Sequence, residues 1–141
     1  MPRALGLDLG ERRIGVAVCD SAGLVATPYE VVTRTGDRRG DHDRIAAIVE
    51  ETQAEVVVVG LPLSLDGTRG PAVDRVEAEM AELGERLDAR IVAWDERLST
   101  VEAERRLHAR GMSGRQRRRV VDELAATVIL QSWLDAGEPP G

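Results

Sequence analysis

The chain has 141 residues, which fits one domain of ordinary size and is too short for two lobes that close over a ligand. Hydrophobic residues make up 43% and charged residues 31%, a composition typical of globular proteins. The apolar runs stop far short of the roughly 20 residues that a membrane span needs, and no signal peptide is recognisable. We expect a cytoplasmic protein without membrane contact, with one domain over residues 1–136 and a frayed tail at 137–141.

The charge is unevenly distributed along the chain. Its net value is −6, which argues against a general polyanion binder. Residues 97–119, however, hold eight arginines and two glutamates, so this stretch carries +6 and the remainder −12. All 19 basic residues are arginine, which excludes mechanisms that need a lysine, such as a P-loop or a Schiff base. The single cysteine, Cys19, fits a buried strand thiol in a reducing compartment.

The first third of the chain predicts three strands without a helix. Residues 3–9 and 14–19 are apolar and are separated by a turn at 10–13, which is the pattern of a hairpin. Residues 24–33 supply a third strand, in which Pro28 indicates an edge or irregular position.

Helical and strand patterns then alternate. Apolar residues recur at helical spacing over 41–53, and the uninterrupted apolar run at 56–61 is typical of a central parallel strand. Pro71 suits the first residue of a helix that runs to about residue 87, and residues 90–94 form the last strand.

Two more helices complete the chain. The pattern Ser99-x-x-Glu102 predicts a helix over about 99–110, and a final helix follows the break at 111–114 and ends near Ala136. The order βββαβαβαα predicts an α/β fold, a mixed five-stranded sheet with helices on its faces. Loops at the carboxyl ends of the parallel strands should converge on a ligand crevice.

Two strands carry acids at conspicuous places. Asp8 lies inside an apolar strand, where an ionised group needs a cation or a partner such as Arg12 or Arg13. Asp95 and Glu96 stand at the end of the last predicted strand. Because neighbours in an extended chain point to opposite faces, we expect only one of these two to enter a site.

A third acid, Asp122, borders the apolar face of the final helix. It sits too far inside the helix to be an N-cap, although it could equally be a solvated edge residue or a partner of Arg118 or Arg119. Three acids that converge from different elements would repel one another unless they bound a divalent cation, and oxygen ligands favour Mg²⁺ or Mn²⁺. Two such metals about 4 Å apart could drive phosphodiester hydrolysis.

Several segments of the chain form a recognisable series when they are taken together and in order. They are Gly6-Leu7-Asp8-Leu9-Gly10, Arg13-Ile14-Gly15-Val16-Ala17, Gly60-Leu61-Pro62-Leu63, Asp66-Gly67, Asp95-Glu96-Arg97-Leu98-Ser99-Thr100, Asp122-Glu123-Leu124-Ala125-Ala126 and Ile129-Leu130-Gln131. This series resembles the YqgF family, also called the RuvX-like pre-16S rRNA nucleases, and the similarity covers nearly the whole chain. By contrast, the turn at Asp8-Leu9-Gly10 alone also resembles actin-like ATPases and sugar kinases, whose second lobe this chain has no room for.

The resemblance implies an RNase H-like fold and a metal-dependent nuclease that trims the 5′ end of pre-16S rRNA during ribosome biogenesis. It places the catalytic and metal-binding acids at Asp8, Glu96 and Asp122, with Asp95 as the rival of Glu96. Two alternatives remain: a Holliday junction resolvase acting on four-way DNA, which needs a homodimer rather than a monomer, and a non-catalytic nucleic-acid-binding or ribosome-assembly factor.

We expect the protein to contact structured RNA or branched DNA through the phosphates. Arg97 could bind a phosphate or pair with a neighbouring acid. The arginines at 115–119 could bind a nucleic-acid backbone or simply lie at a solvated helix start, and the loop at 60–63 could bind phosphate or form a simple turn. The three aromatic residues of the chain are too few for extensive base stacking. The candidate nucleic-acid contacts are Arg13, Arg69, Arg97, Arg115 and Arg118.

Overall fold

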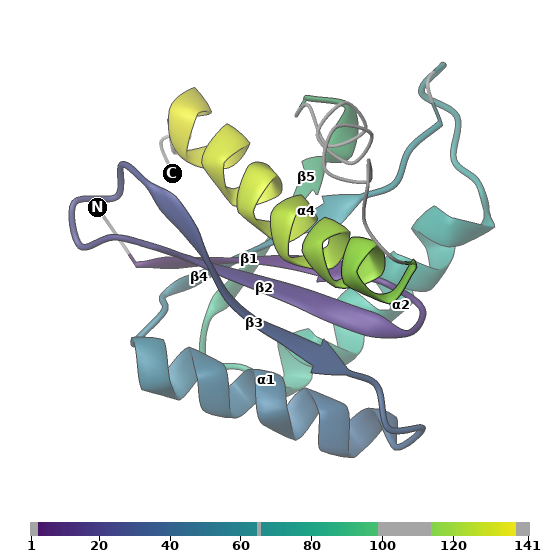
Figure 1. The fold of residues 1–141 in the computed structure, drawn as a ribbon, viewed down its shortest axis with the longest axis horizontal. Helices are drawn as coiled ribbons and strands as arrows, with labels where there is room; N and C mark the ends of the chain where they lie inside the picture. Colours follow the sequence, from purple (N-terminus) through teal and green to yellow (C-terminus); the bar gives the residue numbers. More distant parts are fainter. Residues whose placement is uncertain (1–2, 65, 99–113, 138–141) are drawn as a thin grey trace.

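A computed structural model describes residues 3–64, 66–98 and 114–137, with side chains for all of these except 98 and 114–123. It shows one sheet between two helical layers (Figure 1). The predicted helix at 99–110 and the end of the predicted tail lie outside the described residues. The elements are β1 (Ala4–Leu9), β2 (Arg13–Cys19), β3 (Ala26–Thr33), α1 (Arg38–Thr52), β4 (Val56–Leu61), α2 (Pro71–Arg86), β5 (Arg90–Asp95), the short 3₁₀ turn η1 (Glu96–Leu98) and α4 (Gly114–Ala136).

The sheet is mixed, as predicted, with the strands in the order β3-β2-β1-β4-β5. The pairs β1–β2 and β2–β3 are antiparallel, while β4 joins β1 in parallel and β5 joins β4 in parallel. The carboxyl ends of β1, β4 and β5 therefore meet at one edge of the sheet. This is the edge at which side chains from separate strands can converge.

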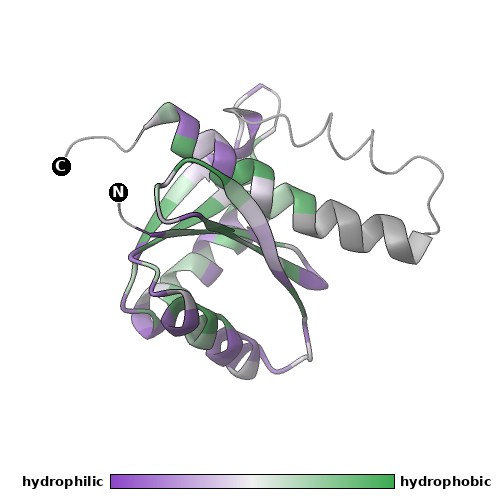
Figure 2. Cartoon of the chain, turned by 60° about the vertical axis from the view of Figure 1, so that its left-hand side comes forward, coloured by the Kyte–Doolittle hydropathy of each residue, from purple (hydrophilic) through white to green (hydrophobic). Residues whose placement is uncertain are grey.

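The core has two layers because successive residues of each strand face opposite sides. On one side, Leu5 and Leu7 of β1 pack with Ile45 and Ile48 of α1 and with Leu83 of α2. On the other side, α4 covers the sheet with residues that include Ala126, Ile129, Leu130 and Trp133. The apolar strands lie between the two helical layers in Figure 2. Within the described part of the chain, no helix is long and apolar enough to cross a membrane.

The sheet edge at β3 has the irregularity that Pro28 predicted. Val16 of β2 pairs with Glu30, but Ala17 pairs with Pro28, so Tyr29 is an extra residue in a bulge. Proline has no N–H to donate, and an edge strand tolerates this loss. Helix α1 begins at Arg38, earlier than predicted. The sequence pattern missed its first turn because those residues are polar and show no apolar period.

Helix α4 lies directly on the backbone of β1. A Cβ on Gly6 would be 2.7 Å from the Ala126 carbonyl oxygen and 2.7 Å from the Leu130 Cβ. No L-residue with a side chain fits there without moving the helix, so the glycine sets how closely α4 approaches the sheet.

We predict that Gly6→Ala destabilises the protein by about 2 kcal/mol, because the added methyl overpacks the contact with α4. Gly84→Ala is the matched control. A Cβ there would make only an ordinary contact of 3.9 Å with the Ile91 Cδ1, and alanine is the better helix former by about 1 kcal/mol. Urea denaturation should therefore show opposite signs for the two variants. Equal stabilities would contradict the close approach at Gly6.

Candidate active site

Asp8 is half-buried near the end of β1, on the face that α4 covers. Its neighbours Leu7 and Leu9 belong to the opposite core layer, so strand alternation turns Asp8 toward α4. Across the sheet, Asp8 pairs with Gly15 of β2. Continuing the β1–β4 register by one residue beyond Leu7↔Val59 puts Gly60 of β4 on its other side. Both neighbours of Asp8 in the sheet therefore lack side chains.

Glu96 approaches the same place from the end of β5. A Cβ on Gly60 would lie 3.0 Å from both the Cγ and the Oε1 of Glu96, so this side chain lies directly over the bare backbone of β4. Neighbouring strands are about 4.8 Å apart, which puts the Glu96 carboxylate roughly one strand away from Asp8. The structure brings these two predicted acids together at the carboxyl edge of the sheet.

Asp95 takes a different role. Its carboxylate accepts hydrogen bonds from the backbone N–H of Arg97 at 2.9 Å and from the Arg97 Nη2 at 2.7 Å. The hydrogen bond from the Arg97 side chain is the main cause that lowers the pKa of Asp95. Of the two rivals at the end of β5, Glu96 is therefore the one that lies over Gly60, while Asp95 fixes the turn that follows the strand.

The backbone of α4 carries position 122 toward Asp8. The Gln131 amide bonds the backbone of Ala26 and Leu24 at the start of β3, so the carboxyl half of α4 lies over the beginning of β1. Ala126 lies over Gly6, and Asp122 precedes it by one helical turn in the direction of Asp8. The Asp122 side chain itself lies outside the described residues.

The chemistry of this donor set fits a hard divalent cation. Asp8 and Glu96 offer carboxylate oxygens, the ligands that Mg²⁺ and Mn²⁺ prefer. Among the side chains that the structure describes, no group of three or more His, Cys, Asp or Glu residues could hold a metal ion. The two acids thus form part of a site, to which a carboxylate from α4 would add the third ligand.

The candidate nucleic-acid residues lie in several places. Arg13 begins β2, and Arg69 is exposed and pairs with Glu77 and, at 3.6 Å, with Asp74. Arg97 pairs with Asp95 and lies against the loop at Gly67. Arg115 and Arg118 belong to the first turns of α4, where the side chains are outside the described part. None of these contacts tests a role in binding nucleic acid.

The loop after β4 folds on itself. The Leu63 N–H donates to the Leu61 carbonyl at 3.0 Å, and the Ser64 N–H donates to the Thr68 carbonyl at 3.2 Å. These two amides are engaged within the loop. For them, the simple-turn interpretation accounts for the sequence better than phosphate binding does.

A buried ion pair supports the turn that follows Asp8, and the sequence interpretation missed it. The Arg34 Nε donates to the Gly10 carbonyl at 2.8 Å, and its two terminal nitrogens donate to Glu79 at 2.9 and 2.8 Å. Glu79 is 3% exposed and lies 2.7 Å from the His42 Nε2. Gly10 in turn donates its N–H to the Asp8 carbonyl at 3.0 Å. The pair therefore anchors the backbone immediately beyond Asp8.

The sequence did carry a signal for Glu79. It stands three residues after Val76 and four before Leu83, on the apolar stripe of α2, where an unpaired charge would be costly. Burial opposes its ionisation, but the hydrogen bonds from Arg34 and His42 outweigh that effect and lower the pKa of Glu79. The same contact raises the pKa of Arg34. Glu79 is thus held as a carboxylate inside the protein.

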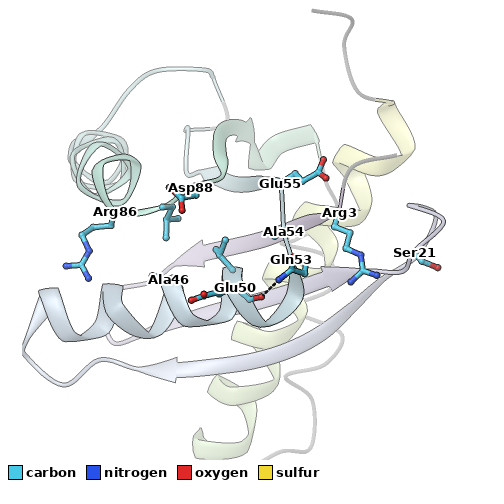
Figure 3. Close-up of a pocket in the computed structure, with 11 residues that line it drawn as sticks. Arg3, Ser21, Ala46, Glu50, Gln53, Ala54, Glu55, Arg86 and Asp88 are labelled. Atoms are coloured by element: carbon cyan, nitrogen blue, oxygen red, sulfur yellow. Dashed lines mark hydrogen bonds between the residues drawn. The ribbon is translucent and has the colours of Figure 1, made fainter.

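One depression on the surface lies away from these acids (Figure 3). It has a volume of about 690 Å³ and lies at the amino ends of β1, β4 and β5, beside the end of α1. Its lining mixes acids and bases, among them Arg3, Glu50, Glu55 and Arg86. Because it is at the opposite edge of the sheet, it takes no part in the site at Asp8.

Comparison with known proteins gives one family and a set of close relatives. The model of the family RuvX, described as Holliday junction resolvase, matches residues 2–136. A protein of Geobacillus kaustophilus (strain HTA426) named "Putative pre-16S rRNA nuclease" is 46% identical over 136 residues, covering 95% of this chain and 98% of the relative. A protein of the same name from Myxococcus xanthus (strain DK1622) is 44% identical over 138 residues, which are 98% of this chain and 91% of its own.

Two solved structures with the same fold are those of junction-resolving enzymes. RuvC of T. thermophilus, in complex with a Holliday junction substrate, superposes with a TM-score of 0.60 at 17% identity over 96% of each chain. The fowlpox virus Holliday junction resolvase gives a TM-score of 0.54 at 10% identity, over 95% of this chain and 99% of its own. At these identities the likeness shows the fold, and it confirms the predicted RNase H-like architecture.

We predict that Glu79→Gln lowers the free energy of unfolding by about 3 kcal/mol at neutral pH, because it leaves Arg34 without its buried counter-charge. The folded pKa of Glu79 is lowered from the ordinary value of 4.5, so its contribution is present above that pH and is lost as the pH falls through the folded pKa. Denaturation measured from pH 7 down to strongly acid conditions should show the difference from the parent protein shrinking toward zero.

The matched control for this prediction is Glu82→Gln. Glu82 lies on the same helix and pairs with Arg38 at 2.7 Å, but its side chain is 53% exposed, and we expect a loss of less than about 1 kcal/mol. Equal losses for the two variants would mean that the buried pair has no special weight.

Proposed function

The chain belongs to the RuvX family, and from this membership we propose that it is a Mg²⁺- or Mn²⁺-dependent nuclease that cuts the precursor of 16S rRNA near its 5′ end. Its nuclease class follows from the family and from relatives that it matches over almost their whole length. Beyond this class, we propose the metal, the catalytic residues and the RNA substrate.

The observation that carries the proposal is the meeting of Asp8 and Glu96 at Gly60. Asp8 lies on β1 and Glu96 follows β5, on opposite sides of β4, and the Glu96 side chain reaches the place beside Asp8 because Gly60 has no side chain. Asp8 and Glu96 place two carboxylates next to each other at the carboxyl edge of the sheet, and a divalent cation between them would be held by oxygen atoms from both. This donor geometry fits a metal site.

Asp8 and Glu96 would hold the metal in this arrangement, with Asp122 as the third ligand from α4. The bound cation would supply an activated water and stabilise the leaving oxygen of the phosphodiester. Asp8 is fixed between two paired strands, and Asp95 fixes the turn that carries Glu96. The chain's own part is thus to keep the carboxylates in place before the substrate binds, so that no reorganisation is needed during the reaction.

The RNA substrate is favoured by the relatives, whose name describes a pre-16S rRNA nuclease and whose lengths match this chain. The second candidate is a four-way DNA junction, which the family description names. Cutting a junction symmetrically needs two active sites in a homodimer, whereas trimming one RNA end needs a single site. The two candidates therefore differ in the oligomeric state that they require.

We predict that Asp8→Asn and Glu96→Gln each reduce the rate of RNA cleavage by about 100-fold or more, because each removes a charged metal ligand. Asp95→Asn is the matched control at the neighbouring position. It weakens a partly exposed pair with Arg97 and should cost less than about fivefold. The assay follows a labelled 5′-extended 16S precursor with purified protein and Mg²⁺ or Mn²⁺. A larger loss in Asp95→Asn than in Glu96→Gln would exchange the roles assigned to these two acids.

We predict that EDTA abolishes cleavage of the same RNA and that added Mn²⁺ restores it, since the acids alone cannot activate a water. A four-way DNA junction tested in parallel should be cut much more slowly. Faster cutting of the junction by a dimeric protein would support resolvase action instead. Binding without cleavage of either substrate would support a non-catalytic assembly factor.

A further inference from the structure

A second pocket lies on the other side of the turn that follows Asp8. It has a volume of about 490 Å³ and is bounded by the turn at 10–13, the end of β3 and the start of α1. Because β1 runs from Asp8 into this turn, the pocket and the proposed metal site share one edge of the sheet. The charged residues that line it are Glu11, Arg12, Arg13, Arg34, Arg38 and Asp41.

Both acids of this pocket are engaged elsewhere. Asp41 is 3% exposed and accepts hydrogen bonds from Thr35, at 3.2 Å from the backbone N–H and at 2.9 Å from the hydroxyl. Glu11 accepts a hydrogen bond from the Arg75 guanidinium at 2.6 Å. Their negative charge is therefore partly satisfied, and four arginines face two acids in the lining.

The arginines of the pocket differ in the hydrogen bonds and ion pairs that their guanidinium groups already make. Arg34 is bound by Glu79, and Arg38 donates to Glu82 at 2.7 Å. Arg12 is exposed, and its guanidinium has no hydrogen-bond or ion-pair partner among the described residues. A guanidinium of this kind offers all its donors to an incoming anion.

The backbone that carries Arg12 is held in place. The Arg34 N–H donates to the Arg12 carbonyl at 2.9 Å, and the Arg34 side chain donates to the Gly10 carbonyl at 2.8 Å. Arg34 is itself fixed by the buried carboxylate of Glu79. The turn is thus anchored at two carbonyls, which lowers the ordering cost of binding.

We propose that this pocket binds a phosphodiester group of the RNA strand whose cleaved bond lies at Asp8, and that Arg12 makes the leading contact. The inference rests on the proposed function for the identity of the polymer. A planar guanidinium matches phosphate oxygens, and contacts of this kind fix the register of a nucleic acid without reading its sequence. A strand that passes over the turn at 10–13 would be held on both sides of it, at the acids and at the arginines.

The test compares Arg12→Gln with Arg39→Gln. Arg39 is a close control because it is also exposed, has no hydrogen-bond or ion-pair partner in the described part of the chain, and lies at the start of α1 without lining the pocket. Each variant removes one positive charge. Affinity for the labelled 5′-extended precursor RNA is measured by fluorescence anisotropy in EDTA over a range of salt concentrations, so that metal-dependent cutting does not interfere.

We expect Arg12→Gln to weaken binding about tenfold, the loss of one charge-assisted hydrogen bond, and to reduce the slope of log affinity against log salt by about 0.7 to 0.9. Arg39→Gln should weaken binding less than about twofold. The thermal unfolding midpoint of Arg12→Gln should match that of the parent, since the Arg12 side chain forms no hydrogen bond or ion pair within the described part of the chain. Equal losses of affinity in the two variants, or no loss in Arg12→Gln, would contradict phosphate binding in this pocket.

A second measurement tests the phosphate contact directly. Single methylphosphonate linkages, which remove one phosphate charge, are placed in turn along the RNA. When the methylphosphonate lies at the linkage that the pocket contacts, the parent protein and Arg12→Gln should bind that RNA with equal affinity. If Arg12→Gln binds more weakly than the parent at every position of the methylphosphonate, the proposal is wrong. Binding is measured without cleavage. If Arg12→Gln weakens RNA binding but the parent protein never cuts RNA, the proposed nuclease function is wrong and the phosphate-binding role of the pocket is supported. Normal cleavage without an Arg12 effect would refute the pocket alone.

Discussion

The close approach of α4 to the sheet is the constraint on which the rest of the structure depends. Gly6 lets the Ala126 carbonyl and Leu130 lie directly on β1, and Gly60 does the same for Ile129 on β4. A side chain on Gly6 would meet the backbone of α4 and lift the helix away from the sheet, so that it would no longer bring position 122 toward Asp8. A side chain on Gly60 would displace the Ile129 and Glu96 side chains, and Glu96 would lose its place over β4. Packing and the proposed chemistry thus depend on the same two missing side chains.

The turn after Asp8 separates two opposite electrostatic environments. On the α4 side lie the carboxylates of Asp8 and Glu96, and on the α1 side lies a pocket rich in arginine. The buried pair of Glu79 and Arg34 fixes the backbone between them through the Gly10 carbonyl. The proposed metal site and the proposed phosphate site require opposite charges within a short distance, and the anchored turn lies between them.

The sequence alone determined the order and type of nearly all the described elements, and its family resemblance implied the RNase H-like fold. Apolar period distinguishes strands from helices locally, and Pro28 indicated an edge or irregular strand because a missing N–H is tolerated at such positions. Asp8 could also be identified as a candidate from local sequence, because an acid inside an apolar strand needs a cation or a partner. The early start of α1 was missed because its first turn is polar, and polar residues carry no periodic signal.

Only the tertiary structure decided which side chains meet. Asp95 and Glu96 are adjacent and equally acidic, and the turn after β5 determines that Asp95 binds Arg97 while Glu96 lies over Gly60. The role of Gly60 and the link from Glu79 through Arg34 to Gly10 join residues from different elements. The physical reason is that local preferences fix backbone conformation, whereas strand register and helix position bring together residues distant in the chain. The apolar period could mark Glu79 as a buried acid, but it does not show which distant residue pairs with it.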